Sequence, residues 1–70
     1  MNIKILVFTV DGEVFASKSQ RATHEELDSI VQYLERIKTM TYFSIRISVN
    51  TEMYFNPDKI IGVQIQKQEV

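Results

Sequence analysis

The first strand pair of this chain is apolar on both faces, and this most constrains the fold. Residues 2–18 read "NIKILVFTVDGEVFASK", where Asp11-Gly12 is a favoured pair for a two-residue type I′ turn. That turn predicts Phe8 opposite Phe15. Cross-strand neighbours share a face, so one face should carry Leu6, Phe8, Val10 and Phe15, and the other Ile3, Ile5, Val7, Val14 and Ala16. Both faces of this hairpin should therefore be buried against other apolar surface.

Residues 23–40, "THEELDSIVQYLERIKTM", predict the one helix of the chain. Thr23 suits the N-cap position, and Glu26 follows it at the spacing of a capping box. The apolar positions then recur as one stripe, formed by Leu27, Ile30, Val31, Leu34 and Ile37. Such a helix covers one side of one sheet.

A hairpin of two strands is expected directly after the helix, and its second strand is short, from Met53 to Phe55. In "YFSIRISVN" the apolar residues Phe43, Ile45, Ile47 and Val49 alternate with polar ones, as in a half-exposed antiparallel strand. A loop at residues 50–52 would pair Val49 with Met53 and Ile47 with Phe55.

Asn56-Pro57-Asp58 predicts a corner before the last strand. Proline presets φ for a turn, and the Asp58 side chain can accept a hydrogen bond from a downstream backbone N–H. Alternation of Ile61, Val63 and Ile65 then predicts a strand over residues 60–65, and we expect residues 66–70 to fray.

Together these segments predict one α+β domain spanning residues 1–70, with the order β-β-α-β-β-β. We expect a single antiparallel five-stranded sheet with one helix. Since one helix cannot hide both faces of the first hairpin, a second copy should cover the remainder, with Leu6, Phe8, Val10 and Phe15 as the candidate interface. Either face of the hairpin could meet the helix, in which case Ile3, Ile5 and Val7 exchange roles with Leu6 and Phe8. Alternatively, the strands curl into a half-barrel and the chain is a monomer.

Composition excludes several classes of function. The chain has no cysteine, which removes disulfides, thiolate nucleophiles and Cys-based metal sites. The apolar start reaches Asp11 too early for a signal peptide, and no run approaches the length of a membrane span, so we expect a cytoplasmic protein. The formal net charge of −1 provides no field for non-specific nucleic-acid binding.

No catalytic, cofactor or metal site is predicted. His24 is the only imidazole and stands beside Glu25 and Glu26 at a helix start, where acidic residues are explained by the helix dipole. Glu52 and Asp58 flank a short strand, but two carboxylates without a third ligand make a poor divalent-cation site. We therefore expect a protein that is not an enzyme.

Exposed aromatics suggest a second surface. Tyr42 and Arg46 lie on the polar face of their strand, and Tyr54 lies on the matching face of the next. Tyrosines beside an arginine can stack unpaired bases, but residues 41–70 carry equal numbers of basic and acidic residues. A protein contact is favoured, with single-stranded nucleic acid as the alternative.

The stretch "EMYFNPDKIIGVQIQ", residues 52–66, resembles the strand, Asn-Pro-Asp, strand endings of small uncharacterised proteins from phages and prophages of Gram-positive bacteria. This resemblance implies an accessory protein of a mobile element that binds and modulates a host factor. With the apolar hairpin, it predicts a non-enzymatic protein-binding module that forms a homodimer.

Overall fold

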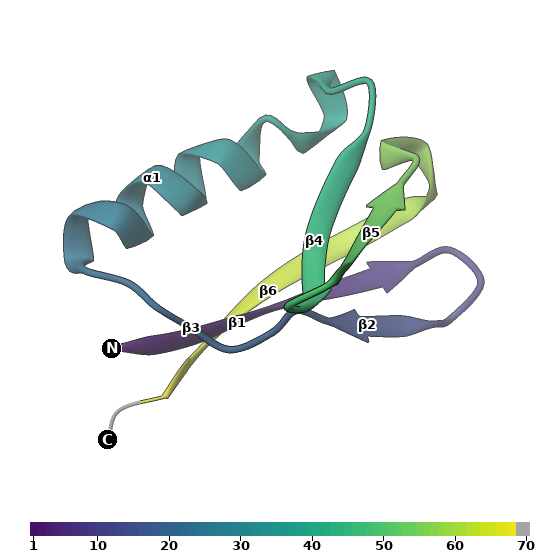
Figure 1. Cartoon of the computed structure of the whole chain (residues 1–70). Helices are drawn as coiled ribbons and strands as arrows, with labels where there is room; N and C mark the ends of the chain where they lie inside the picture. The colour runs from purple at the N-terminus through teal and green to yellow at the C-terminus, as the bar shows by residue number, and fades with distance from the viewer. Residues whose placement is uncertain (69–70) are drawn as a thin grey trace.

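The computed structural model describes residues 1–68 and has an α+β fold (Figure 1). Its helical elements are α1 (His24–Glu35) and the 3₁₀ turns η1 (Ile37–Thr39) and η2 (Pro57–Lys59). Its strands are β1 (Asn2–Thr9), β2 (Val14–Ala16), β3 (Gln20–Arg21), β4 (Phe43–Ser48), β5 (Thr51–Phe55) and β6 (Ile60–Gln68). The predicted small domain with one α-helix and antiparallel strands is thus confirmed for the described residues.

The strands form two sheets, so the predicted single five-stranded sheet is wrong. In sheet A, β1 is central, with β2 and β3 on one side and β6 on the other. Sheet B consists of β4 and β5. A backbone hydrogen bond from the Lys18 N–H to the Arg46 carbonyl (2.7 Å) links the two. Folding sheet B over sheet A buries apolar surface that a continuous sheet would leave in water.

The inner face of sheet A carries Ile3, Ile5 and Val7. It is covered by α1 near one end and by sheet B and η1 near the other. Near one end, α1 packs Leu27 together with Ala22 against Ile3, which is completely buried. Near the other end, sheet B and η1 cover Val7 in a cluster formed by Val7, Ile37, Phe43, Ile45 and Ile60. The helix and sheet B lie on the same side of sheet A (Figure 1).

The first hairpin is shifted by one residue from its predicted register. Phe15 lies opposite Val7, and Val14 lies opposite Phe8. A one-residue slip exchanges the two faces of a strand, so Phe15 moves to the inner face. There its ring packs edge-on against Phe55, with centroids 5.4 Å apart.

The reason lies in the turn. A type I′ turn needs positive φ at both central residues, but among the described residues only Gly12 has one (φ 85°). The chain instead makes a three-residue loop, Val10 to Gly12, in which the Gly12 N–H donates to the Thr9 carbonyl (3.1 Å). The Thr9 hydroxyl donates to the Asp11 carboxylate and thereby lowers the pKa of Asp11.

An irregular segment at residues 17–19 separates β2 from β3. The pairing of β3 with β1 is offset by one residue from that of β2, as expected for a bulge. Ser17 stabilises the break because its hydroxyl accepts a hydrogen bond from the Ile5 N–H (2.8 Å), while its own N–H donates to the Ile5 carbonyl (2.8 Å). This edge of sheet A is consequently short and interrupted.

The second hairpin also departs from its predicted register. Met53 lies opposite Ile45 rather than Val49, and Phe55 lies opposite Phe43 rather than Ile47. The pairing shifts between Arg46 and Ser48, and the chain turns at residues 49–50. Both registers place apolar residues opposite apolar ones, so the alternation that predicted the strand could not choose between them.

The helix begins as predicted but ends earlier. Thr23 caps it: the Glu26 N–H donates to the Thr23 hydroxyl (3.1 Å), and the Thr23 N–H donates to the Glu26 carboxylate (3.0 Å). The α-helix stops at Glu35, where the prediction extended to residue 40, and η1 follows. Within residues 1–68 no helix is long or apolar enough to cross a membrane.

The Asn-Pro-Asp corner leads from sheet B to sheet A as the turn η2. The Asn56 side chain, rather than that of Asp58, closes the corner by accepting from the Asp58 N–H (3.0 Å), and Pro57 is buried. The strand β6 continues past residue 65 to Gln68, which pairs with Asn2. The expected fraying of residues 66–68 is therefore wrong, and residues 69–70 lie outside the described part.

Candidate interaction surfaces

The outer face of sheet A is a surface of mixed apolar and polar side chains that no described element covers. It consists of Lys4, Leu6, Phe8, Val14, Ala16, Gly62, Gln64 and Gln66, which cross-strand pairing places on one side. Both α1 and sheet B lie on the opposite side (Figure 1). Val14 is 55% exposed, whereas Leu6 and Phe8 are half-buried among their neighbours. Gly62 beside Phe8 adds no side chain that would shield the ring.

The predicted interface residues are only partly together. Leu6 and Phe8 lie on the outer face, and Val10 is exposed in the loop at the end of the hairpin. Phe15 belongs to the inner face and packs in the core, so its assignment to this surface is wrong. Val14 was missed because the turn was taken as two residues long; Asp-Gly also suits the last two positions of a three-residue loop, so the dipeptide alone could not distinguish the two turns.

The predicted tyrosine surface does form on the exposed side of sheet B. The rings of Tyr42 and Tyr54 lie 5.5 Å apart and are 59% and 63% exposed. Arg46 lies on the same face, opposite Glu52 in the hairpin. The structure thus brings Tyr42, Arg46 and Tyr54 together on one surface.

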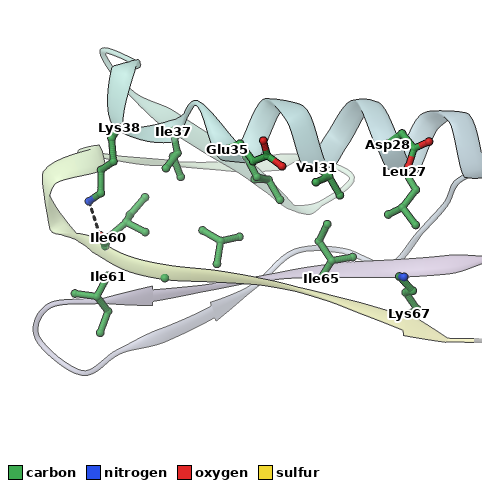
Figure 2. A pocket seen from close by; sticks show the side chains of 13 residues that line it. Leu27, Asp28, Val31, Glu35, Ile37, Lys38, Ile60, Ile61, Ile65 and Lys67 are labelled. Carbon is green, nitrogen blue, oxygen red and sulfur yellow. Dashed lines mark hydrogen bonds between the residues drawn. The ribbon is translucent and has the colours of Figure 1, made fainter.

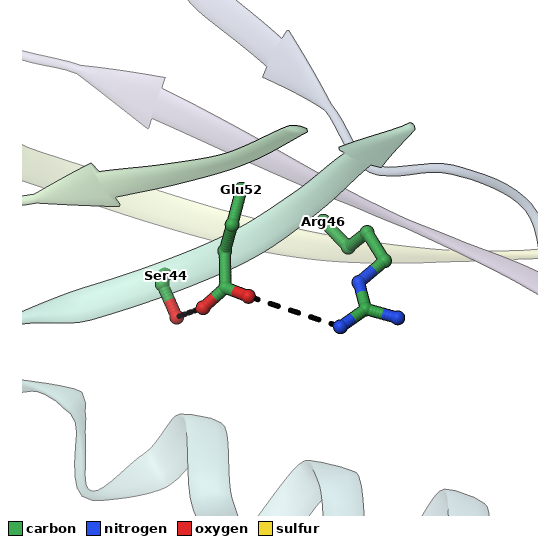
Figure 3. A network of polar contacts seen from close by, with 3 residues as sticks. All are labelled: Ser44, Arg46 and Glu52. Atoms are coloured by element: carbon green, nitrogen blue, oxygen red, sulfur yellow. Dashed lines mark hydrogen bonds and ion pairs between the residues drawn. The ribbon is translucent and has the colours of Figure 1, made fainter. Parts of the chain in front are cut away.

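Glu52 changes the charge of this surface, and sequence reasoning did not include it there. Its carboxylate accepts a hydrogen bond from the Ser44 hydroxyl (3.0 Å) and lies 3.9 Å from the Arg46 guanidinium (Figure 3). The negative charge of Glu52 also raises the pKa of Tyr54, because it disfavours a second anion nearby. The basic residue of the tyrosine surface is therefore paired with an acid.

A groove between α1 and β6 is the third surface, and no sequence pattern predicted it. Its volume is about 550 Å³. The helix contributes Leu27, Val31 and Leu34, and the strand contributes Val63 and Ile65. Figure 2 shows Leu27 and Val31 pointing from the helix toward the strand, while Ile65 points back toward the helix. Val31 is 38% exposed although it belongs to the predicted buried stripe.

Lys38 closes one end of this groove. Its ammonium donates to the carbonyls of Pro57 (2.8 Å) and Ile60 (2.6 Å), and Figure 2 shows the second of these bonds. The rim of the groove carries the acids Asp28 and Glu35 and the bases Lys38 and Lys67. The groove is consequently apolar inside, with a rim of both charge signs.

The remaining ionisable candidates do not form a site. His24 is the exposed first residue of α1, Glu52 is engaged with Ser44 and Arg46, and Asp58 lies in η2. Among residues 1–68, no three His, Cys, Asp or Glu side chains are grouped so that they could hold a metal ion.

No protein-family model, curated protein or solved structure matches this chain.

Proposed function

We propose that this protein is a non-enzymatic protein-binding module that works as a homodimer. The observation that carries the proposal is the outer face of sheet A, where β1 and β2 present apolar side chains while every large covering element packs on the inner side. Burial of apolar surface drives most protein association, and an exposed apolar patch framed by polar residues is typical of a contact surface.

The side chains on these surfaces support binding rather than catalysis. The outer face offers Leu6, Phe8 and Val14 with two glutamines and a lysine at its margin, none of which is arranged as a nucleophile beside a base. Apolar and aromatic residues of this kind supply contact area instead.

The resemblance of residues 52–66 to phage and prophage proteins extends the proposal to the partner. We propose an accessory protein of a mobile element that acts in the cytoplasm and modulates a host protein. In that case the outer face of sheet A would bind the host factor.

Site-specific photo-crosslinking tests the proposal. A benzoylphenylalanine replaces Val14 on the outer face, and in the control it replaces Val49, which is 71% exposed in the turn of sheet B. We expect a discrete adduct from position 14 in a Gram-positive host, either with a second copy or with a host protein identified by mass spectrometry. Equal, diffuse labelling from both positions, or none from position 14, would contradict the proposal.

A second candidate function is binding of single-stranded nucleic acid, and it rests on the exposed, adjacent rings of Tyr42 and Tyr54 beside Arg46. Aromatic rings next to a guanidinium can stack successive bases. Fluorescence anisotropy with a labelled oligonucleotide at low salt is the test. Under this function Tyr54→Ala weakens binding, and Glu52→Gln strengthens it by releasing Arg46. No binding at tens of micromolar protein would eliminate this candidate.

A further inference from the structure

The edge of β6 that faces away from β1 has no pairing partner among the described strands. This strand is the longest of the described strands, and among them it pairs only with β1. In an antiparallel strand every second residue directs its N–H and C=O away from a given neighbour, so the far edge of β6 presents a row of such groups. One of these carbonyls, at Ile60, is taken by Lys38.

The opposite edge of sheet A is protected against further pairing, and this edge is not. The opposite edge of sheet A is broken at residues 17–19, and Lys18 there bonds to sheet B. By contrast, residues 60–66 read "IIGVQIQ", without a charge or a proline. Proteins normally protect an exposed edge with charged residues, proline or a short strand. The one irregularity in β6 lies at its start, where the register shifts between Phe8 and Thr9.

The helix leaves room beside this edge. Leu27, Val31 and Leu34 line the groove above β6, and Val31 is more than a third exposed. A further strand added to β6 would place its inward side chains in this groove, against the helix. The occupant must be extended, apolar at every second residue and free of charge over several residues.

We infer that the occupant is β6 of a second copy, paired antiparallel about a two-fold axis. This inference rests on the proposed homodimer and locates its contact at the β6 edge, which leaves the outer face of sheet A free for the host factor. β6 itself meets each requirement of the groove, since Val63 and Ile65 alternate with glutamines and its own edge is equally free. An isologous pairing therefore satisfies both edges and fills both grooves at once.

A register centred on Gln64 suits this arrangement. It sets Val63 of each copy beside Ile65 of the other on the inner side, under both helices. On the outer side the two Gln64 amides meet, and each amide offers both a donor and an acceptor. The two outer faces of sheet A then become one continuous surface.

The charges of the rim agree with self-pairing. An isologous contact brings each patch against a copy of itself, so a rim of one sign would repel its partner. The groove rim has two acids, Asp28 and Glu35, and two bases, Lys38 and Lys67. A stable contact takes about 800 Å² from each partner, roughly a sixth of the 5113 Å² accessible on one chain.

Sedimentation equilibrium of the full chain over a micromolar concentration range tests the inference. We expect a monomer–dimer equilibrium for the wild type. Val31→Lys places a charge in the groove, and Gln64→Lys places like charges together at the axis, so each should weaken association about tenfold or more. Val49→Lys is the matched control and should leave association unchanged. Circular dichroism of each variant verifies that it is folded.

Hydrogen exchange provides a readout that needs no variant. Amides of β6 should exchange more slowly at high than at low protein concentration, while those of β5 should not change. A chain that stays monomeric, or a dimer that persists in both lysine variants and dissociates in Val14→Lys, would overturn the inference. In either case a Val14 adduct with a host protein would still support the proposed binding function, so the two failures are distinguishable.

Discussion

Gly12 and Gly62 differ in backbone conformation rather than in the space around them. A Cβ built at either residue would have no atom within 4 Å, but only Gly12 has a positive φ, of 85°. A side chain at such a φ brings Cβ close to the carbonyl oxygen. Of the two positions, only the one in the first turn therefore requires glycine for its backbone conformation.

Gly12→Ala should therefore destabilise the fold, by about 1–2 kcal/mol of unfolding free energy. Gly62→Ala is the matched control and should leave stability unchanged or raise it by up to about 1 kcal/mol, because alanine restricts the unfolded chain. Urea denaturation of both variants checks this. Equal losses in the two would show that the positive φ of Gly12 does not decide its requirement for glycine.

Phe43 is the residue on which the core depends most. It is 1% exposed, and its ring packs against those of Tyr33 and Phe55, with centroids 6.0 and 6.3 Å away. Phe43→Ala should cost about 3–5 kcal/mol, enough to unfold much of so small a domain. The neighbouring exposed residue provides the comparison, since Tyr42→Ala should cost well under half as much by urea denaturation.

At the scale of elements, the cap of α1 couples the helix to pH. The Thr23 N–H that donates to the Glu26 carboxylate holds the pKa of Glu26 below its ordinary value of 4.5. A carboxyl with a lowered folded-state pKa stabilises the fold above its unfolded pKa, and this stabilisation is lost as the pH falls through the folded pKa. The helix start should therefore weaken in acid.

Glu26→Gln isolates this effect, because the amide oxygen can accept the same hydrogen bond without titrating. We expect the melting temperature of the wild type to fall more steeply than that of the variant as the pH drops below about 4.5. Identical slopes for wild type and Glu26→Gln would contradict the assignment.

The junction of η1 with η2 depends on a lysine rather than on apolar packing alone. Lys38 donates to two carbonyls of the corner that starts β6. Lys38→Met keeps the aliphatic stem and removes both bonds, so it should cost about 1–2 kcal/mol in thermal or urea unfolding. Lys18→Met, whose side chain stands exposed beside the bulge, should cost much less.

Element boundaries were predictable to the extent that local contacts set them. The capping box marks the start of α1, and proline marks η2, because each depends on residues within one turn. The early end of α1 and the extension of β6 to Gln68 could not be predicted in this way. The first depends on how η1 packs Ile37 into the core, and the second on pairing with Asn2.

At the scale of the whole molecule, stability should depend on protein concentration. A dimer formed through β6 stabilises the folded state by mass action. The melting temperature of the wild type should rise with concentration, whereas that of Val31→Lys should not. Differential scanning calorimetry over a tenfold range or more of concentration checks this, and a constant melting temperature for the wild type would speak against a homodimer.

The candidate surfaces, like the element boundaries, were predictable where they depend on local sequence patterns and unpredictable where they depend on contacts between distant residues. Strict alternation placed Tyr42, Arg46 and Tyr54 on one exposed face, and the structure brings them together, because both pairing registers of that hairpin preserve the face. The prediction that Phe15 lies on the outer face was wrong, because a one-residue error in the length of the first turn exchanges the two faces of β2. The groove could not be foreseen, because it depends on where α1 rests on sheet A.

The sequence by itself determined the order of the five longer strands and the helix, the cap of the helix and the apolar stripe of each strand, but it did not predict the two-residue strand β3 before the helix. These follow from hydrogen bonds and periodicity within a few residues. Only the tertiary structure decided that Ile3 and Val7 face inward, that sheet B folds over sheet A, and that β6 is left as a free edge beside an apolar groove. Both faces of β1 are apolar, so the choice between them depends on packing among residues far apart in the chain.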